Sequence, residues 1–222
     1  MLLMMPPENK SLKTRPTYYL LLALFLLLPS CAPSLPLYLD VHRDQPYSEQ
    51  GEEEAVLLVA PFSAEKAAAS AIGELFSWQG SQKIWVDNKA LSEGITAKIE
   101  ENLARRGVPF RTISTWNGTI AGMQGIGNGR QAILGGTVRL LRITSTRKML
   151  RTVATLDLKV DCHIGLPQRA SLITRSVEVK QEKTLLVQNS KELENLLDEG
   201  LQEAADRLVG ELNKALNTTP AR

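Results

Sequence analysis

The sequence contains very few of the side chains from which most catalytic and metal sites are built. Only two cysteines and two histidines occur among its 222 residues, and His42 lies far along the chain from His163. A metal site would need further ligands at workable spacing, and the sequence shows none. Neither the Gly-x-Ser-x-Gly pattern of hydrolases nor the His-Glu-x-x-His pattern of metalloproteases occurs. The sequence therefore predicts no enzyme activity, no cofactor and no metal site.

Long hydrophobic runs are also scarce. A transmembrane helix needs about 20 apolar residues, and the apolar stretch from Tyr18 to Leu28 is much shorter and ends at Pro29. The basic side chains of Lys10 and Arg15 precede this stretch. A basic segment followed by a short apolar run is typical of a secretory signal. We therefore expect residues 1–30 to be a signal peptide, with an uncleaved membrane anchor as the alternative.

A cysteine directly follows the predicted signal. Leu28, Ser30 and Cys31 resemble the end of a bacterial lipoprotein signal, although Pro29 replaces the small residue that is usual there. The resemblance implies that Cys31 is the lipidation site, with acyl chains that hold the protein permanently at a membrane. It also implies an outer-membrane location facing the periplasm, because Ala32 and not aspartate follows the cysteine. A cleaved signal with a chance cysteine beside the cut remains the alternative.

An excess of charge of one sign is missing from the predicted mature chain. Subtracting Glu8, Lys10, Lys13 and Arg15 from the chain totals of 26 basic and 24 acidic residues leaves 23 of each. This balance gives no electrostatic reason to expect a nucleic-acid partner. If Cys31 is acylated, Cys162 is the only remaining thiol, and an intramolecular disulfide is impossible.

The rest of the chain divides into a tether and one domain. Residues 31–54 are rich in proline and polar side chains, which favours a lipidated tether. Residues 55–217 are long enough for a single periplasmic domain with a substantial core.

Hydrophobic periodicity predicts the main elements of this domain. Strands are expected at 56–62, 83–86, 110–115, 133–143, 153–164 and 173–180, and helices are expected from about 88 to 106 and from about 191 to 216. Asp87 or Asn88 is the expected N-cap of the first helix, and Leu140-Leu141 interrupts the alternation of its strand, which predicts a β-bulge. The last two strands form a predicted antiparallel hairpin. The fold class that follows is α+β, a two-layer domain with two helices on one face of a mostly antiparallel sheet.

Three features invite a chemical interpretation. The glycine-rich stretch from Gly122 to Gly129 lacks the following helix and the Gly-Lys-Ser/Thr sequence of a phosphate-binding loop, so we interpret it as an ordinary loop. Cys162 and His163 are adjacent on a strand and are expected to face opposite sides, with Cys162 in the core. The three tryptophans, Trp78, Trp85 and Trp116, are expected to pack in the core unless one of them is exposed at a contact surface.

The layout resembles two groups of bacterial lipoproteins. Its features are Cys31, the run VLLVAPF at 56–62, Trp85 before the first helix, the strand AILGGTVRLLRI at 132–143, the hairpin and the C-terminal helix. They are similar to the auxiliary lipoproteins of ABC-type intermembrane transport systems, among them the paraquat-inducible-operon lipoprotein family. The YajG-type lipoproteins are similar in the same order of elements.

These resemblances imply a non-enzymatic, lipid-anchored envelope protein. It would assist an intermembrane lipid-transport or envelope-maintenance complex through contacts with other envelope proteins. Association with further copies of itself is left open. The alternative is a periplasmic lipoprotein that binds a lipid or another small ligand in a pocket between helices and sheet.

Overall fold

The computed structural model describes residues 35–41, 57–64, 71–77, 80–126, 131–148, 151–185 and 190–217. All described residues belong to one compact unit, Ser34–Arg222. Cys31, His42 and Trp78 lie outside the described residues.

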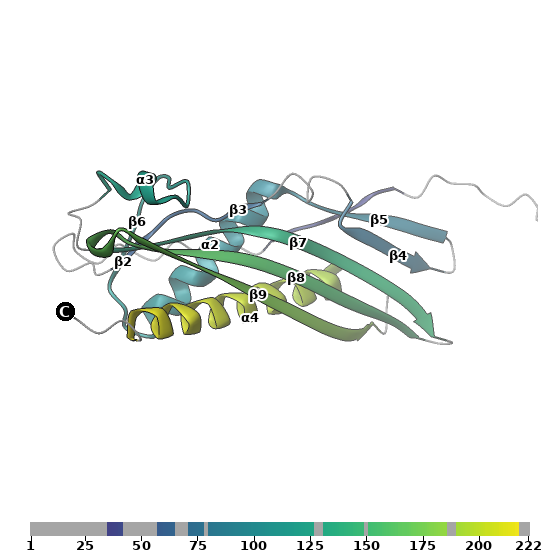
Figure 1. Ribbon diagram of the computed structural model, residues 1–222. Helices are drawn as coiled ribbons and strands as arrows, with labels where there is room; N and C mark the ends of the chain where they lie inside the picture. The colour runs from purple at the N-terminus through teal and green to yellow at the C-terminus, as the bar shows by residue number, and fades with distance from the viewer. Residues whose placement is uncertain are drawn as a thin grey trace, which may run out of the picture. The chain divides into compact units, whose positions relative to one another are not determined.

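The described elements are strands, two long helices and two short helical turns (Figure 1). In chain order they are β1 (Leu37–Leu39), β2 (Leu57–Val59), β3 (Ser63–Ala64), β4 (Gly73–Ser77), β5 (Gly80–Val86), α2 (Asn88–Arg105), β6 (Phe110–Thr112), α3 (Ile120–Met123), β7 (Ala132–Lys148), β8 (Arg151–Leu166), the 3-10 turn η2 (Pro167–Arg169), β9 (Ser171–Leu185) and α4 (Ser190–Asn217). Among these helices, none is both long and apolar enough to span a membrane.

The described strands form one sheet built around β7. One edge of β7 pairs in parallel with β2, β3 and β4 in succession, and its other edge pairs antiparallel with β8. The sheet then extends from β2 to β6 and from β4 through β5 to β1, while β9 pairs with β8. The predicted hairpin of β8 and β9 is confirmed, with its register running from Thr152↔Leu185 to Leu166↔Ser171.

The prediction of a mostly antiparallel, two-layer sheet is wrong in part. The pairs β1–β5, β2–β6, β2–β7, β3–β7 and β4–β7 are all parallel, so the sheet is mixed. Parallel neighbours need a crossover connection, and here the connection from β2 to β6 runs through β3, β4, β5 and then α2. The broader α+β assignment is confirmed.

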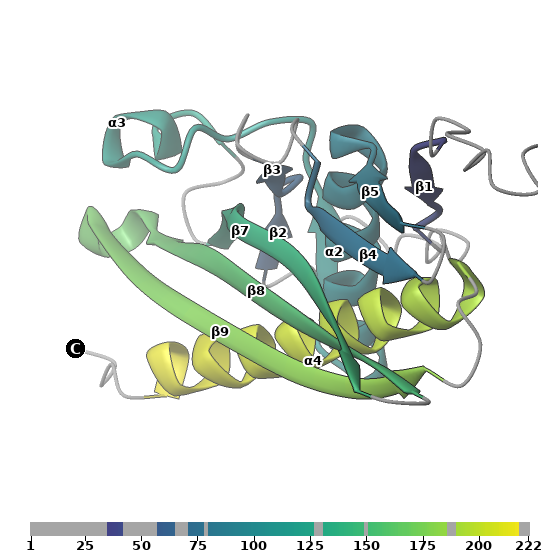
Figure 2. The same cartoon turned by 90° about the vertical axis from the view of Figure 1, so that its right-hand side faces the viewer.

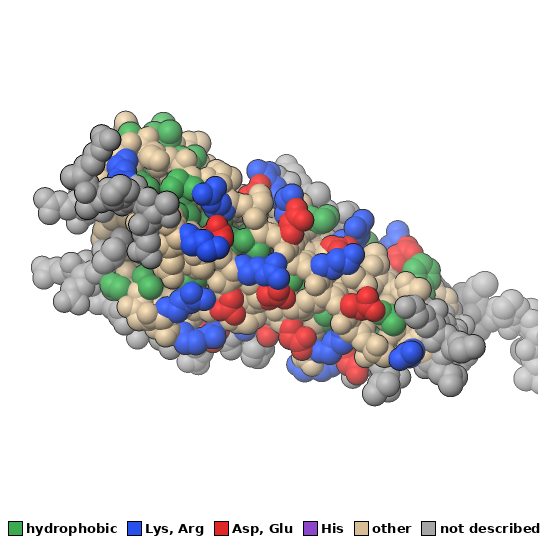
Figure 3. Space-filling view, turned by 60° about the horizontal axis from the view of Figure 1, so that its bottom comes forward, with side chains coloured by type: hydrophobic (Ala, Val, Ile, Leu, Met, Phe, Trp, Pro, Cys, Tyr) green, Lys and Arg blue, Asp and Glu red, His purple; other side chains and the backbone are tan. Residues whose placement is uncertain are grey.

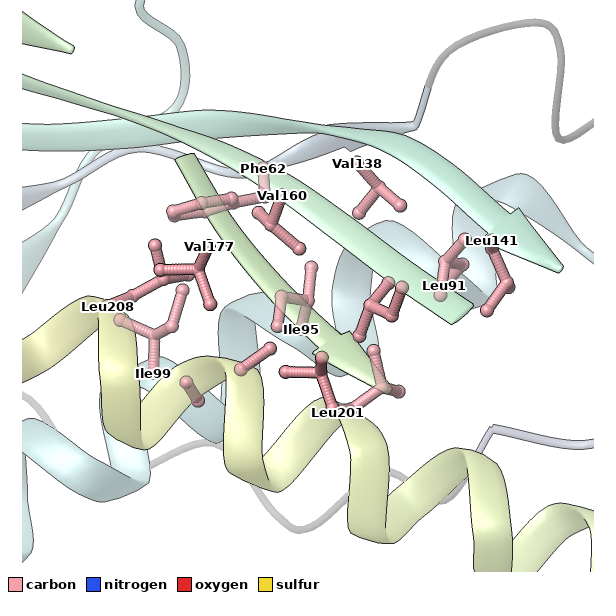
Figure 4. Close-up of a cluster of buried hydrophobic side chains, with 14 of the residues drawn as sticks. Phe62, Leu91, Ile95, Ile99, Val138, Leu141, Val160, Val177, Leu201 and Leu208 are labelled. Atoms are coloured by element: carbon pink, nitrogen blue, oxygen red, sulfur yellow. The ribbon is translucent and has the colours of Figure 1, made fainter. Parts of the chain in front are cut away.

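One continuous core lies between the sheet and its two long helices (Figure 2). The predicted stripe of α2 is fully buried at Leu91, Ile95, Ile99 and Leu103. Asp87 caps this helix as expected, because its Oδ1 accepts hydrogen bonds from the backbone amides of Lys89 and Ala90 at 2.6 and 2.9 Å. Figure 4 shows side chains of α2 and α4 meeting those of the strands.

The helix α4, which the periodicity predicted at about 191–216, buries one apolar stripe. Ten of its side chains are fully or almost fully buried: Leu193, Leu196, Leu197, Leu201, Ala204, Ala205, Leu208, Val209, Leu212 and Ala215. Its edge is tied to β9 by polar contacts, among them Lys183 Nζ to Glu199 Oε1 at 2.8 Å and Arg207 Nη1 to the Glu178 carbonyl at 2.7 Å. Lys98 of α2, 6% exposed, pairs with Asp198 of α4 at 3.2 Å.

A small third layer covers the opposite face of the sheet at one end. Leu57 and Val59 face the main core, whereas Leu58 between them faces the other way. Leu58, Met123 and Ile133 form this second cluster, and Ile113, Trp116 and Ile126 pack on it. The segment 113–126 therefore adds a layer that the two-layer prediction did not contain.

The strand β1 belongs to the folded domain, although its sequence lies inside the predicted tether. Leu37–Leu39 pairs in parallel with residues 84–86 of β5, and Gln82 Nε2 donates a 2.5 Å hydrogen bond to the Leu35 carbonyl. Leu39 and Val41 are buried. A three-residue strand is too short to show a periodicity, so composition alone assigned this segment to the tether.

Candidate functional site

The adjacent residues Cys162 and His163 of β8 face opposite sides of the sheet, as predicted. Cys162 is fully buried in the main core. His163 lies on the other face, where its Nδ1 is 3.1 Å from Thr174 Oγ1 and its ring contacts Gly118. Because the thiol and the imidazole are separated by the sheet, they cannot form a nucleophile–base pair.

The chemistry of Cys162 follows from its burial, which raises the pKa of its thiol from 9.0 to about 12. At pH 8 we therefore expect about a thousandfold less thiolate than for a free cysteine, and correspondingly slow reaction with maleimide. The measurement is the labelling rate of the Cys31→Ser variant, in which Cys162 is the only thiol. The same protein unfolded in urea is the control, and equal rates in both states would contradict the prediction.

The glycine-rich stretch begins inside a short turn of helix, α3, whose N-cap is Thr119. Residues 127–130 lie outside the described residues, and the next element is the strand β7. A strand after the glycines confirms that the pattern does not match a phosphate-binding loop, which requires a helix there. Within the described parts of the chain, no group of three or more His, Cys, Asp or Glu side chains could hold a metal ion.

A hollow on the outer face of the sheet, away from α2 and α4, is our candidate functional site. It lies between β4 and the second half of β7 and has a volume of about 420 Å³. Two large apolar side chains line it, Phe76 at 45% exposure and Leu140 at 42%. Ala71, Ile72 and Glu74 complete one wall, and Arg142 and Thr144 lie on the other. We call this hollow the Phe76–Leu140 groove.

The wall formed by β4 depends on a close approach to β7. An added Cβ on Gly73 would lie 1.7 Å from the carbonyl oxygen of Ile143, so only glycine allows this pairing. Ser145 holds the same strand, because its Oγ accepts from the Phe76 amide at 2.9 Å and donates to the Glu74 carbonyl at 3.0 Å. These contacts fix the backbone that carries Phe76.

The opposite wall depends on the predicted β-bulge. The β7–β8 register shifts between Val138 and Leu140. An extra residue in one strand changes which side chains face the core, and here Leu141 is buried while Leu140 points outward. The bulge inferred from the adjacent leucines is therefore confirmed. It also produces an apolar side chain on the outer face.

Ion pairs cover the strands beside the groove. Arg142 Nη2 is 3.2 Å from Asp157 Oδ2, and Lys159 Nζ is 2.7 Å from Glu178 Oε1. Farther along β8, partial burial acts to raise the pKa of Asp161, but hydrogen bonds from Ser176 and Arg139 outweigh it and hold this pKa below its usual value. The charged side chains on the strands beside the groove are therefore paired with one another, and the groove between them is mainly apolar.

Basic and acidic side chains are also interspersed over the face seen in Figure 3. Lys183–Glu199 and Arg175–Glu211 are pairs of this kind between β9 and α4, at 2.8 and 3.8 Å. Such exposed pairs contribute little stability individually. They do prevent a strong field of one sign where they occur.

Comparison with known sequences gives no family assignment, since no family model and no curated protein matches the chain. Solved structures do show similarity. A Xanthomonas campestris protein of the DUF330 family matches with a TM-score of 0.49 and 12% identity, over 84% of this chain and 100% of that one. A minor lipoprotein from Acinetobacter baumannii matches with a TM-score of 0.42 and 12% identity, over 72% and 94%. The PelC dodecamer from Paraburkholderia phytofirmans gives 0.37 and 8%, over 74% and 95%.

Similarities at this level transfer no function to the chain. The functional argument therefore rests on the chain's own residues.

Proposed function

We propose that this protein is a bacterial envelope lipoprotein, anchored to the membrane through Cys31, that acts by binding a protein partner. The observation that carries the proposal is the Phe76–Leu140 groove, a hollow that two large exposed apolar side chains line, with ion pairs on the neighbouring strands. Apolar surface of this kind is removed from water when a partner binds. The surroundings of Cys162 and His163 give no support for a catalytic function as the alternative to binding.

The groove has the composition of a small interface centre. Aromatic and large aliphatic side chains at the centre of a patch supply most of the binding energy, and the polar groups around them exclude water and select the partner. Phe76 and Leu140 are the large exposed apolar side chains of the groove, and Glu74 and Arg142 are among its polar lining. The proposed partner is another envelope protein, such as a component of an intermembrane transport or envelope-maintenance complex, and the proposed location is the periplasmic side of the outer membrane.

The anchor is tested by mass spectrometry of the mature N-terminus. We expect the native protein to begin at an acylated Cys31, and we expect the Cys31→Ser variant to carry no lipid, because the thiol is the acylated group. The Cys162→Ala variant is the matched control and should be acylated like the native protein. An unmodified N-terminus at Ala32, or an intact leader in the native protein, would contradict the proposal.

The groove is tested by site-specific photocrosslinking of the full-length protein in its own envelope. A photoreactive residue in place of Phe76 or Leu140 should give one discrete adduct, whose partner is identified by mass spectrometry. The control is the photoreactive residue in place of Glu178, on the ion-paired part of the sheet. The yield of crosslinked adduct from this position should be about tenfold lower. A Leu140→Ser change should reduce the adduct formed from position 76 by a similar factor, because burying a leucine contributes about 1.5–3 kcal/mol. Equal yields at all three positions would refute the proposal.

A further inference from the structure

The two most exposed large apolar side chains of the described residues lie at the beginning of the domain. Leu35 is 76% exposed and Tyr38 is 68% exposed, more than any other described side chain of this kind. Tyr38 belongs to β1, which lies at the edge of the sheet beside β5 (Figure 2). Exposed apolar side chains are ordinary when they are scattered singly, but a group of them marks a contact surface.

The pairing of β1 determines where these side chains lie. Leu39 is buried in the main core, and Tyr38 faces the other side of the sheet, because successive residues of a strand face opposite sides. Tyr38 is the register partner of Trp85 on β5, which is half-buried on the same face. Leu35, just before β1, is held by the hydrogen bond from Gln82 to its carbonyl. We call Leu35, Tyr38 and Trp85 the β1 edge.

The composition of the β1 edge is that of a membrane–water interface. Tyrosine and tryptophan combine an apolar ring with a polar tip, and both are enriched where one end of a side chain is in lipid and the other in water. The charges on this face oppose one another, since Lys83 of β5 is the register partner of Glu74 of β4. Asp40 lies toward α4, where it lines a hollow with Lys191 and Glu194. The face therefore suits lipid through its apolar groups and not through an excess of charge.

The length of chain before the β1 edge indicates what covers it. Cys31 precedes Leu35 by four residues, which span at most about 14 Å. The polar headgroup region adds about 5–7 Å to each side of the hydrocarbon core. If Cys31 is acylated, Leu35 therefore lies in the headgroup region or directly above it.

The same short linker lowers the affinity that the contact needs. A second contact on an anchored molecule is intramolecular, and a short linker gives it an effective concentration in the millimolar range. A few side chains are then enough to keep the β1 edge on the membrane.

We infer that the β1 edge rests in the headgroup region of the bilayer and seats the domain on the membrane surface. The inference rests on the proposed anchor at Cys31, but it requires no partner in the Phe76–Leu140 groove. It assigns to lipid the face of β1 and β5 that Tyr38 and Trp85 share.

The test measures how strongly lipids that carry a nitroxide quench a fluorophore on the protein. The acylated full-length protein is reconstituted in vesicles of phosphatidylethanolamine and phosphatidylglycerol, with Cys162→Ala so that the label cannot react with the core thiol. One sample is labelled at Lys83→Cys, on β5, and the control sample at Glu178→Cys, on β9. The strands β1 and β9 are five positions apart in the sheet, about 24 Å at the usual strand spacing. Quenching should be several-fold stronger at position 83 than at position 178.

A pair of variants connects this quenching to the β1 edge. Leu35→Ser combined with Tyr38→Ser should lower the quenching at position 83 to nearly the value at position 178, while the lipid keeps the protein on the vesicles. Ile120→Ser, which removes an exposed apolar side chain from α3, is the matched control and should leave the quenching unchanged. Circular dichroism establishes that each variant is folded.

Two results would overturn the inference while the anchor is present. They are equal quenching at positions 83 and 178, and unchanged quenching in the folded double variant. If these side chains served a protein partner, position 83 would not be quenched in vesicles that contain only lipid. Mass spectrometry of each preparation shows whether Cys31 is acylated. An unacylated native protein would refute the anchor, and the membrane seat with it.

Discussion

Replacing Leu208 by alanine is expected to lower the free energy of unfolding by about 2–5 kcal/mol. Leu208 is fully buried in α4 and belongs to the same core cluster as Ile99 of α2 and Val177 of β9, all labelled in Figure 4. Removing its branched end leaves a cavity at the junction of both helices and the sheet, where no single element can shift to fill it. Urea denaturation followed by circular dichroism measures the change.

The matched control for Leu208 is Glu199→Ala on the same helix. Glu199 is exposed and pairs with Lys183 of β9 at 2.8 Å, so its loss should cost less than about 1 kcal/mol. If both variants lost the same stability, α4 would not be packed on the sheet through its apolar stripe.

Gly136→Ala is expected to destabilise the domain by about 3 kcal/mol, although it adds only one methyl group. The new Cβ would lie 2.3 Å from the Asp161 carbonyl oxygen and 2.3 Å from Cε1 of Phe62. The first of these atoms belongs to the backbone of the paired strand, and the second to a ring buried in the core. Moving the first would disturb the β7–β8 pairing, and moving the second would disturb the core packing.

The opposite result is expected for Gly210→Ala in α4, where an added Cβ meets no atom within 4 Å. Alanine has the higher helix propensity, so this change should stabilise the domain by about 0.5–1 kcal/mol. Thermal unfolding of both variants measures the contrast. A Gly136→Ala protein within about 0.5 kcal/mol of the native one would show that β7 and β8 can separate to accommodate the methyl group.

The elements that could be predicted from sequence are those with a strong local pattern. The four-residue spacing of Leu91, Ile95, Ile99 and Leu103 specifies α2, and strict alternation specifies β8 from Leu156 to Ile164. These patterns arise because each element has one buried face. Such a pattern predicts where an element lies in the sequence and which of its faces is buried. For α2 and for β8 the structure agrees with both predictions.

The elements that were missed depend on partners distant in sequence. The strands β1 and β3 have three and two residues and exist because β5 and β7 lie beside them. The parallel pairing of β2 with β6 and β7 leaves no trace in periodicity, since a parallel and an antiparallel neighbour bury the same face. Burial patterns therefore predicted a sheet without predicting its direction of pairing.

The candidate sites show the same division. The adjacent leucines at 140–141 predicted the bulge, but nothing in the sequence indicated that β4, which carries Phe76, would pair with β7, which carries Leu140. Trp116 was recognised only as an aromatic residue, because its contacts with Gly135 and Gly165 join segments far apart in the chain. Tyr38 was assigned to the tether, because its place beside Trp85 depends on the pairing of β1 with β5.

The small strand β1 determines how the domain responds to mechanical load. If Cys31 holds the chain at a membrane, any pull transmitted toward the domain arrives first at Leu37–Leu39, which is held to β5 by three residue pairs. Behind it, β7, β8 and β9 are joined along nearly their whole length. Tension would therefore detach β1 first and lengthen the tether as far as β2, which begins at Leu57, while the hydrogen-bonded ladder of the long strands stays intact.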